Sequence, residues 1–300
     1  MKTIEIGRDK DLAQTPINYK QYIKRAARST DYSKLITEDV TILNQQKQPV
    51  IVYLRDPEMP SQKMIQILQK IEYEEHRRVD GLVSRSRIFG FMPREQIRKD
   101  YCSSTALARE MPDEHLYICQ FGSYLSNFYK KYCPDIYNSH LKVADERILK
   151  DWTIDNSPFT SGIINKNNPL KYHFDSGNIS KVYSNMVCFR KDCEGGNLAI
   201  PELDIALEIA NKSVLLFDGQ AIMHGVTPFH ITSKHGYRYT LVYYTLKQMW
   251  NCQPITEEIA RIRTRKASRE LKRFKHLTGE LDDDQMDILA KYGKHKRHLF

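Results

Sequence analysis

Two histidines and one aspartate have the side-chain types and the spacing to hold a metal ion. His173 and Asp175 are two residues apart, and His224 follows 49 residues after Asp175. Residues i and i+2 of a strand project to the same face, so the first two side chains point one way. Two imidazoles and one carboxylate suit Fe(II), and three protein ligands leave three octahedral positions open for small ligands. A lone His-x-Asp could instead be a surface hydrogen-bonding pair, so the prediction depends on His224 meeting it.

An arginine in a predicted strand follows the second histidine. In the β-rich run 237–245, Arg238, Thr240, Val242 and Tyr244 share one face of a strand. An inward arginine in a closed sheet needs an anionic partner. A dicarboxylate ligand would supply it, because a guanidinium grips a carboxylate through two hydrogen bonds and the Thr240 hydroxyl can donate another. The alternative is that Arg238 pairs with a structural Asp or Glu.

Short strands must position these residues. Runs rich in Val, Ile, Tyr and Phe alternate with Gly, Asn and Pro turns from Ser157-Pro158 to residue 246. We expect eight strands near 159–165, 170–175, 182–190, 197–200, 205–210, 213–218, 222–228 and 237–246. This spacing predicts a closed or sandwiched antiparallel sheet such as a jelly roll. Outside it, the patterns predict a strand over 48–54 and helices near 19–28, 60–78, 112–131 and 256–275.

The residues around these motifs resemble the TET/JBP branch of the Fe(II)/2-oxoglutarate dioxygenases. The ordered motif His173-Phe-Asp175, His224 and Arg238-x-Thr240 matches the superfamily. The branch is indicated by Pro158-Phe159-Thr160-x4-Asn165, His173-Phe-Asp175-x-x-Asn178, Gly195–Glu202, Leu216–Gly219 and His224–Pro228. The cysteine-rich module of animal TET proteins and an obvious base-J-binding domain are absent, which leaves the identity of the modified base open.

The resemblance implies a fold, cofactors and a reaction. The fold is α+β, a double-stranded β-helix (jelly-roll) core with N-terminal helices and a C-terminal basic helix. His173, Asp175 and His224 are then the catalytic iron ligands, and Arg238 and Thr240 hold 2-oxoglutarate. With O2, a ferryl species abstracts hydrogen from the 5-methyl group of 5-methylcytosine or thymine in DNA, and rebound delivers the hydroxyl. The protein orients the C–H bond and excludes water.

Two basic segments are candidates for DNA contact. A base inside a duplex must leave the stack to be oxidised, which requires cations for phosphates and aromatic surfaces for the base. Segment 85–99 is expected to be a loop in which Arg85 and Arg87 bind phosphate and Phe89 contacts the base. Segment 259–276 carries eight Lys or Arg and a single acid, and predicts a phosphate-binding helix. The alternative for this helix is a solvated charged face.

Two asparagines flank the expected iron site. Asn165 and Asn178 could each hydrogen-bond substrate or cosubstrate, whereas Asn178 could instead simply form a turn. Two other functions remain open for the whole chain. One is an Fe(II)/2-oxoglutarate hydroxylase of a protein side chain or small molecule. The other is a catalytically silent nucleic-acid-binding jelly-roll protein.

Composition sets the remaining expectations. The net charge of +9 favours polyanionic partners but also fits a merely soluble basic protein. No apolar run reaches the roughly 18 residues of a membrane span, and the start Met1–Glu5 is not a signal peptide. We therefore expect no membrane or obligate protein partner and a cytoplasmic protein, or a nuclear one in a eukaryote. Six cysteines without zinc spacing predict reduced thiols.

Domain boundaries follow these patterns. We expect a mainly helical region over 1–150 that packs on the core, the catalytic core over 151–250, and a basic helical extension over 251–300, together forming one integrated catalytic unit.

Overall fold

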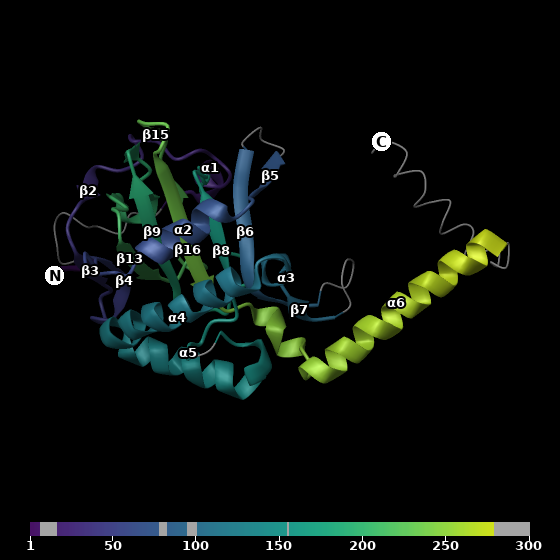
Figure 1. The fold of residues 1–300 in the computed structure, drawn as a ribbon. Coiled ribbons are helices and arrows are strands. Elements are labelled where there is room, and N and C mark those ends of the chain that lie inside the picture. Colours follow the sequence, from purple (N-terminus) through teal and green to yellow (C-terminus); the bar gives the residue numbers. More distant parts are fainter. Residues whose placement is uncertain (7–16, 78–82, 95–100, 155, 279–300) are drawn as a thin grey trace. The chain divides into compact units, whose positions relative to one another are not determined.

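The computed structural model describes residues 1–6, 17–77, 83–94, 101–154 and 156–278 (Figure 1). The chain divides into two compact units, Met1–Cys252 and Gln253–Phe300. The first unit holds every strand of the described chain, and the second holds one long basic helix, α6 (Ile255–Thr278).

A ten-stranded sheet forms the large layer of the first unit. Its central strands are antiparallel neighbours, and β16 pairs with both β9 and β8. In spatial order the strands are β1 (Lys2–Glu5), β3 (Val40–Leu43), β4 (Pro49–Arg55), β13 (Ser213–Phe217), β9 (Ser184–Lys191), β16 (Tyr237–Tyr244), β8 (Ser161–Lys166), β6 (Val83–Met92) and β5 (Glu74–Arg77), with β7 (Ser103–Ser104) paired to β6.

A four-stranded sheet covers one face of the large sheet. Its order is β14 (Gly225–Val226), β11 (Leu198–Ile200), β12 (Ile205–Leu207) and β2 (Lys34–Ile36). Buried side chains such as Cys188 and Leu215 from the large sheet meet Ile200 and Leu207 from the small one. A separate ribbon joins β10 (Cys193–Gly195) to β15 (Phe229–Ile231). The result is a β-sandwich, as the strand spacing predicts.

Helices pack on the opposite face of the large sheet (Figure 1). The apolar side of α2 (Gln62–Lys70) and the long α4 (Pro112–Tyr132) bury Leu68, Phe121 and Leu125 against Phe189 and Leu241. The remaining helices and 3-10 turns of this unit are α1 (Tyr19–Tyr22), α3 (Ala106–Glu110), α5 (Pro134–Arg147), η1 (Lys150–Trp152), η2 (Pro201–Leu203) and η3 (Lys247–Asn251).

Several sequence-based element predictions were wrong in informative ways. The expected strand at 170–175 is an irregular segment with one isolated bridge from His173 to His224. The expected loop at 85–94 is strand β6 as far as Met92, which pairs with β8 on one side and β5 on the other. The first expected helix is confined to α1, and the helix expected at 60–78 ends at Lys70 and is followed by β5. Helix α5, strands β10 and β15 and the N-terminal strands β1–β3 were not predicted.

The prediction of six reduced thiols was wrong for two of them. Cys102 and Cys252 form a disulfide across 150 residues of sequence, and both are buried. Sequence spacing gave no signal for this pair, because the two positions meet only through the tertiary fold. No helix in the described residues is long and apolar enough to cross a membrane.

Candidate metal and cosubstrate site

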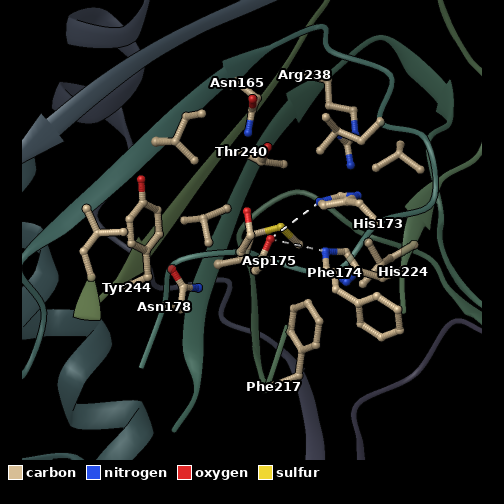
Figure 2. Close-up of a pocket in the computed structure, with 18 residues that line it drawn as sticks. Asn165, His173, Phe174, Asp175, Asn178, Phe217, His224, Arg238, Thr240 and Tyr244 are labelled. Carbon is tan, nitrogen blue, oxygen red and sulfur yellow. Dashed lines mark ion pairs between the residues drawn. The ribbon is translucent and has the colours of Figure 1, made fainter. Parts of the chain in front are cut away.

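A cavity of about 300 Å³ lies between the two sheets of the sandwich (Figure 2). Arg238, Thr240, Val242 and Tyr244 all line it, which confirms that these alternating residues of β16 face inward. Apolar side chains make up much of the remaining wall: Ile163, Leu170, Phe174, Met186, Leu198, Phe217, Val226 and Leu246.

The three predicted metal ligands meet at this cavity. His173, Asp175 and His224 each offer one ligand atom, and these atoms all lie within 4.8 Å of one another. Oδ1 of Asp175 is 3.5 Å from Nε2 of His173 and 3.9 Å from Nε2 of His224. Figure 2 shows the three side chains pointing toward a common point. The motif spacing therefore predicted a cluster that the fold forms from residues far apart in the chain.

Backbone hydrogen bonds, rather than a regular strand, bring the ligands together. The amide of His173 donates to the carbonyl of His224 at 3.0 Å, and the reverse bond is 3.1 Å. The amide of Asp175 donates to the carbonyl of Gly219 at 2.8 Å. A Cβ at residue 219 would lie 2.2 Å from Oδ2 of Asp175, so only glycine leaves room for the carboxylate.

Both imidazoles are oriented for metal binding. Nδ1 of His173 lies 2.7 Å from the carbonyl of Lys171, and Nδ1 of His224 lies 2.9 Å from the carbonyl of Ile222. A carbonyl only accepts, so each Nδ1 carries the proton and donates it. The lone pair is then on each Nε2, the atom that faces Asp175. Such carbonyl contacts fix the tautomer and ring orientation of metal-binding histidines.

Burial sets the protonation states of the cluster. It lowers the pKa of His224 to about 4, and His173 adds to that effect. Burial alone would raise the pKa of Asp175, but the hydrogen bond from His173 and the charges of the two imidazoles, when they are protonated, bring it below its usual value. A neutral imidazole next to a carboxylate is the state that binds a divalent cation.

Arg238 provides a buried cation beside the cluster. Its side chain is 2% exposed, Nη2 donates to the carbonyl of Gly196 at 3.1 Å, and Nε has no hydrogen-bond partner. Burial lowers the pKa of the guanidinium, yet arginine stays charged in proteins. Among the described residues no Asp or Glu pairs with Arg238. The alternative of a structural acid partner is therefore excluded for that part of the chain.

The surroundings of Arg238 are shaped for a bound anion. Gly196 has φ +73°, and a Cβ there would lie 2.9 Å from Nε of Arg238. Thr240 is buried on the same face of β16, directly opposite Asn165 on β8. An orphaned guanidinium donor with a neighbouring hydroxyl matches the donors that a carboxylate requires.

The two asparagines also reach the cavity. Oδ1 of Asn165 accepts a hydrogen bond from Nδ2 of Asn168 at 3.0 Å. Nδ2 of Asn178 donates to Oγ of Ser184 at 3.3 Å. Both asparagines are buried, and both line the cavity. Their side chains are placed where a contact with a bound molecule is sterically available.

Strand β6 does not fulfil the predicted role of a DNA-binding loop. Phe89 is fully buried in the helix-side core, so its predicted contact with a displaced base was wrong. Arg87 is buried and paired with Glu110, and Arg85 is paired with Glu75 at 2.5 Å. None of the three lines the cavity. The pairing was missed because the acids are distant in sequence. Residues 95–99 of the predicted segment lie outside the described residues.

The second predicted DNA segment forms a helix. α6 spans Ile255–Thr278, and Arg263, Lys266 and Arg269 are exposed along it. The side chains beyond Leu271 lie outside the described residues.

Two residues that contact the ligand-bearing segments were not singled out in the sequence. Oε1 of Glu202 accepts the amide of Met223 at 3.0 Å, next to His224, and Oε2 accepts the hydroxyl of Tyr19 at 3.0 Å. The ring of Tyr19 also meets Phe174 edge-on at 5.4 Å. Glu202 was considered only as part of the Gly195–Glu202 motif, and nothing near Tyr19 in sequence indicates its distant partner.

The N-terminal segment also braces the other ligand-bearing segment. The amide of Tyr172 donates to the carbonyl of Arg25, and the amide of Lys24 donates to the carbonyl of Tyr172, both at 2.9 Å. The hydroxyl of Tyr172 donates to Asp31 at 3.0 Å. Residues 17–32 therefore contact the chain on both sides of the metal cluster.

Comparisons with known proteins show which family the chain resembles. Residues 93–247 match the Tet_JBP family, the oxygenase domain of the 2OGFeDO superfamily. The chain is 26% identical to "Thymine dioxygenase JBP1" of Trypanosoma brucei brucei over 171 residues, 56% of this chain and 20% of that protein. It thus spans about a fifth of the length of this curated relative.

A solved structure gives the same fold. "NgTET1 in complex with 5mC DNA" aligns with a TM-score of 0.54 at 16% identity, covering 80% of this chain and 91% of that chain. An oxidoreductase of the 2OG-Fe(II) oxygenase family from Burkholderia pseudomallei aligns with a TM-score of 0.42 at 11% identity, over 65% of this chain and 84% of that one. The NgTET1 alignment confirms the predicted α+β class with a jelly-roll core.

Proposed function

Because the chain belongs to the TET/JBP family of 2-oxoglutarate- and Fe(II)-dependent oxygenase domains, we propose that it hydroxylates the 5-methyl group of a pyrimidine in DNA, either 5-methylcytosine or thymine. One observation carries the proposal: the His173–Asp175–His224 cluster and the buried Arg238 open onto one cavity. The names of the relatives support the substrate class, since one is called a thymine dioxygenase and the other was solved with 5mC DNA.

The residues present fit the cofactors of this family. His173, Asp175 and His224 would hold iron, because two neutral imidazoles and one carboxylate form a donor set of the right type and charge. Arg238 and Thr240 would hold the distal carboxylate of 2-oxoglutarate, since the orphaned Nε of Arg238 supplies an unused donor. Iron, 2-oxoglutarate and O2 together supply an oxidant that converts a C–H bond to C–OH, with release of succinate and CO2.

The chain itself contributes orientation and a dry site. Phe174, Phe217 and Leu246 line the cavity and keep water from the reacting C–H bond. Asn165 and Asn178 supply hydrogen-bonding groups for the polar edge of a base. A cavity of about 300 Å³ admits a small molecule but not a duplex. The target nucleotide must therefore leave the helical stack before it reacts.

The test is direct oxidation of DNA. The protein is incubated with Fe(II), 2-oxoglutarate, O2 and duplexes that contain either thymine or 5-methylcytosine, and the digested nucleosides are weighed by mass spectrometry. We expect the addition of one oxygen to one of the two bases. The Asp175→Ala variant, treated in the same way, should give unmodified nucleosides. Succinate formation without any oxidised base would show turnover of 2-oxoglutarate uncoupled from DNA and would reject both pyrimidines as the substrate.

The charge of α6 provides a second discriminating measurement. Neutralising Arg263, Lys266 and Arg269, all exposed, should weaken DNA oxidation at low salt and make it less salt-dependent, if α6 contacts phosphates. Unchanged oxidation of DNA by the triple glutamine variant would leave α6 as a solvated charged face.

A further inference from the structure

A second hollow lies on the opposite face of the large sheet. Its volume is about 590 Å³, and its lining includes Lys166, Lys191, Lys234, Tyr237 and Tyr239. We call these five residues the lysine hollow. No carboxylate belongs to its described lining. It shares strands with the reaction cavity but none of its lining residues.

Strand register explains why the lysines gather. Lys191 is directly opposite Tyr237, and Lys166 is directly opposite Tyr239. Directly opposed residues of an antiparallel pair, and residues i and i+2 of one strand, project to the same face. Arg238 lies between the two tyrosines and therefore projects to the other side, into the cavity. Strand β16 thus serves two sites, one on each face.

The third lysine is carried by an ordered turn. Oγ of Ser233 donates to Asp192 at 2.7 Å, the amide of Thr232 donates to the carbonyl of Asp192 at 2.9 Å, and the amide of Gly236 donates to the carbonyl of Ser233 at 3.0 Å. A Cβ at Gly236 would lie 2.7 Å from the carbonyl oxygen of Asp192, so the turn closes only with glycine. These contacts hold Lys234 beside the ends of β9 and β16.

The hollow concentrates the positive charge of three lysines. In the part of the chain that the structure describes, none of the three lysines forms an ion pair. The Lys166 ammonium lies over the ring of Tyr73, 5.2 Å from its centroid. Asp192 raises the pKa of Tyr237, with burial the larger cause, but its carboxylate already accepts from Ser233. Like charges that converge in this way favour a bound anion.

We propose that the lysine hollow binds phosphate groups of nucleic acid, away from the site of oxidation. Three ammonium groups, two on strands and one on a turn, bind phosphate as point charges, without reading bases. The partly exposed ring of Tyr237 borders the same hollow and offers an aromatic surface. The identity of the ligand as DNA rests on the proposed function, whereas the phosphate chemistry of the hollow does not.

The experiment compares two double variants of the full chain. Lys191→Gln/Lys234→Gln removes two exposed cations of the hollow, and Lys130→Gln/Lys131→Gln removes two exposed cations at the end of α4. Binding of a fluorescent duplex is measured by anisotropy across salt concentrations. We expect the hollow variant to bind on the order of tenfold more weakly in 0.1 M salt and its salt slope to fall by about 1.8, at about 0.9 for each phosphate contact. The α4 variant should bind as the wild type does.

Equal effects in the two variants, or an unchanged salt slope in the hollow variant, would overturn the proposal. Inorganic phosphate is titrated in parallel, with binding followed by phosphorus NMR. If the hollow variant loses phosphate binding but keeps its affinity for DNA, the ligand is a small phosphate and nucleic acid is rejected. Nucleoside mass spectrometry on the wild type reports separately on the proposed function, so either idea can fail while the other stands.

Discussion

The two ends of the reaction cavity are built by different means. Arg238 and Thr240 lie within the eight-residue strand β16, which is hydrogen-bonded to strands on both sides. The metal cluster lies in irregular chain, where single bridges join His173 to His224 and Asp175 to Gly219. The end with Arg238 and Thr240, which we call the cosubstrate end, takes its geometry from a sheet. The end with the metal cluster, which we call the metal end, depends on a few individual contacts.

The two ends therefore differ in how firmly the backbone holds them and in how well their charges are compensated. The cosubstrate end is held firmly but keeps a buried charge without an acidic partner among the described residues. The metal end has compatible charges but relies on Gly219, Glu202 and the N-terminal segment for its shape. Substitutions at the two ends should therefore have opposite effects on the stability of the metal-free protein.

The largest effect is expected from removing the carboxylate of the cluster. Asp175→Ala deletes the anionic ligand, and we expect the affinity for Mn²⁺, used as a redox-stable probe, to fall by at least about 100-fold. Metal binding is measured by electron paramagnetic resonance. Glu194→Ala, at an exposed acid outside the cavity, is the matched control. Retained Mn²⁺ affinity in Asp175→Ala would refute the assignment of the metal cluster.

A substitution that replaces no ligand should have nearly the same effect. Gly219→Ala places a Cβ where Oδ2 of Asp175 lies, so the carboxylate must rotate away. We expect Mn²⁺ affinity to fall by about 10–100-fold, the range for groups that orient metal ligands. Ala221→Gly loosens the same loop without crowding Asp175. If both variants lose affinity equally, loop flexibility rather than the steric contact controls the site.

Substitution of Arg238 should not destabilise the metal-free protein but should weaken binding of the cosubstrate. Arg238→Met removes the buried charge and keeps much of the apolar volume, so the free energy of unfolding of the metal-free protein should not fall and can rise by up to about 3 kcal/mol. Binding of 2-oxoglutarate to the Mn²⁺-loaded protein should weaken by about 30-fold or more, as expected for losing one partner of a buried charge pair. Urea unfolding and calorimetry measure the two quantities. A large loss of stability would show that Arg238 has a structural role.

Substitutions at Glu202 test whether its hydrogen bonds to Met223 and to Tyr19 of the N-terminal segment affect metal affinity. Glu202→Ala leaves the amide of Met223 without its acceptor, and we expect Mn²⁺ affinity to fall by about tenfold. Glu202→Gln keeps an oxygen acceptor and should restore most of the affinity. Tyr19→Phe deletes only one hydroxyl and should have the smaller effect. If glutamine fails to rescue, the charge of Glu202 matters more than its hydrogen bond.

The two ends of the cavity were also unequally predictable from sequence. The inward face of β16 follows from alternation alone, so Arg238 and Thr240 could be placed without tertiary information. The ligand residues could be named from motif spacing, but their segment was wrongly expected to be a strand. Residues that act through distant contacts, such as Tyr19, leave no local pattern. Phe89 shows the converse error, because an aromatic beside arginines looks the same in sequence whether it is buried or exposed.

The smallest effect concerns a histidine that neither end uses. His140 is fully buried, its Nε2 lies 2.7 Å from Oγ1 of Thr245 just after β16, and burial lowers its pKa to about 3. The unfolded chain takes up a proton below about pH 6.5, and the folded protein does not until about pH 3, so the free energy of unfolding falls as the pH falls between these values. Between pH 7 and 5.5 this histidine should account for a loss of about 1 kcal/mol.

Urea unfolding of the metal-free wild type and His140→Asn at the two pH values isolates this contribution, because the other histidines are common to both proteins. The wild type should lose about 1 kcal/mol more than the variant as the pH falls. Equal losses would mean that His140 is protonated in the folded state. In that case Thr245, and with it the end of β16, would be held by a charged group, and the cosubstrate end would be less independent of pH than its strand geometry implies.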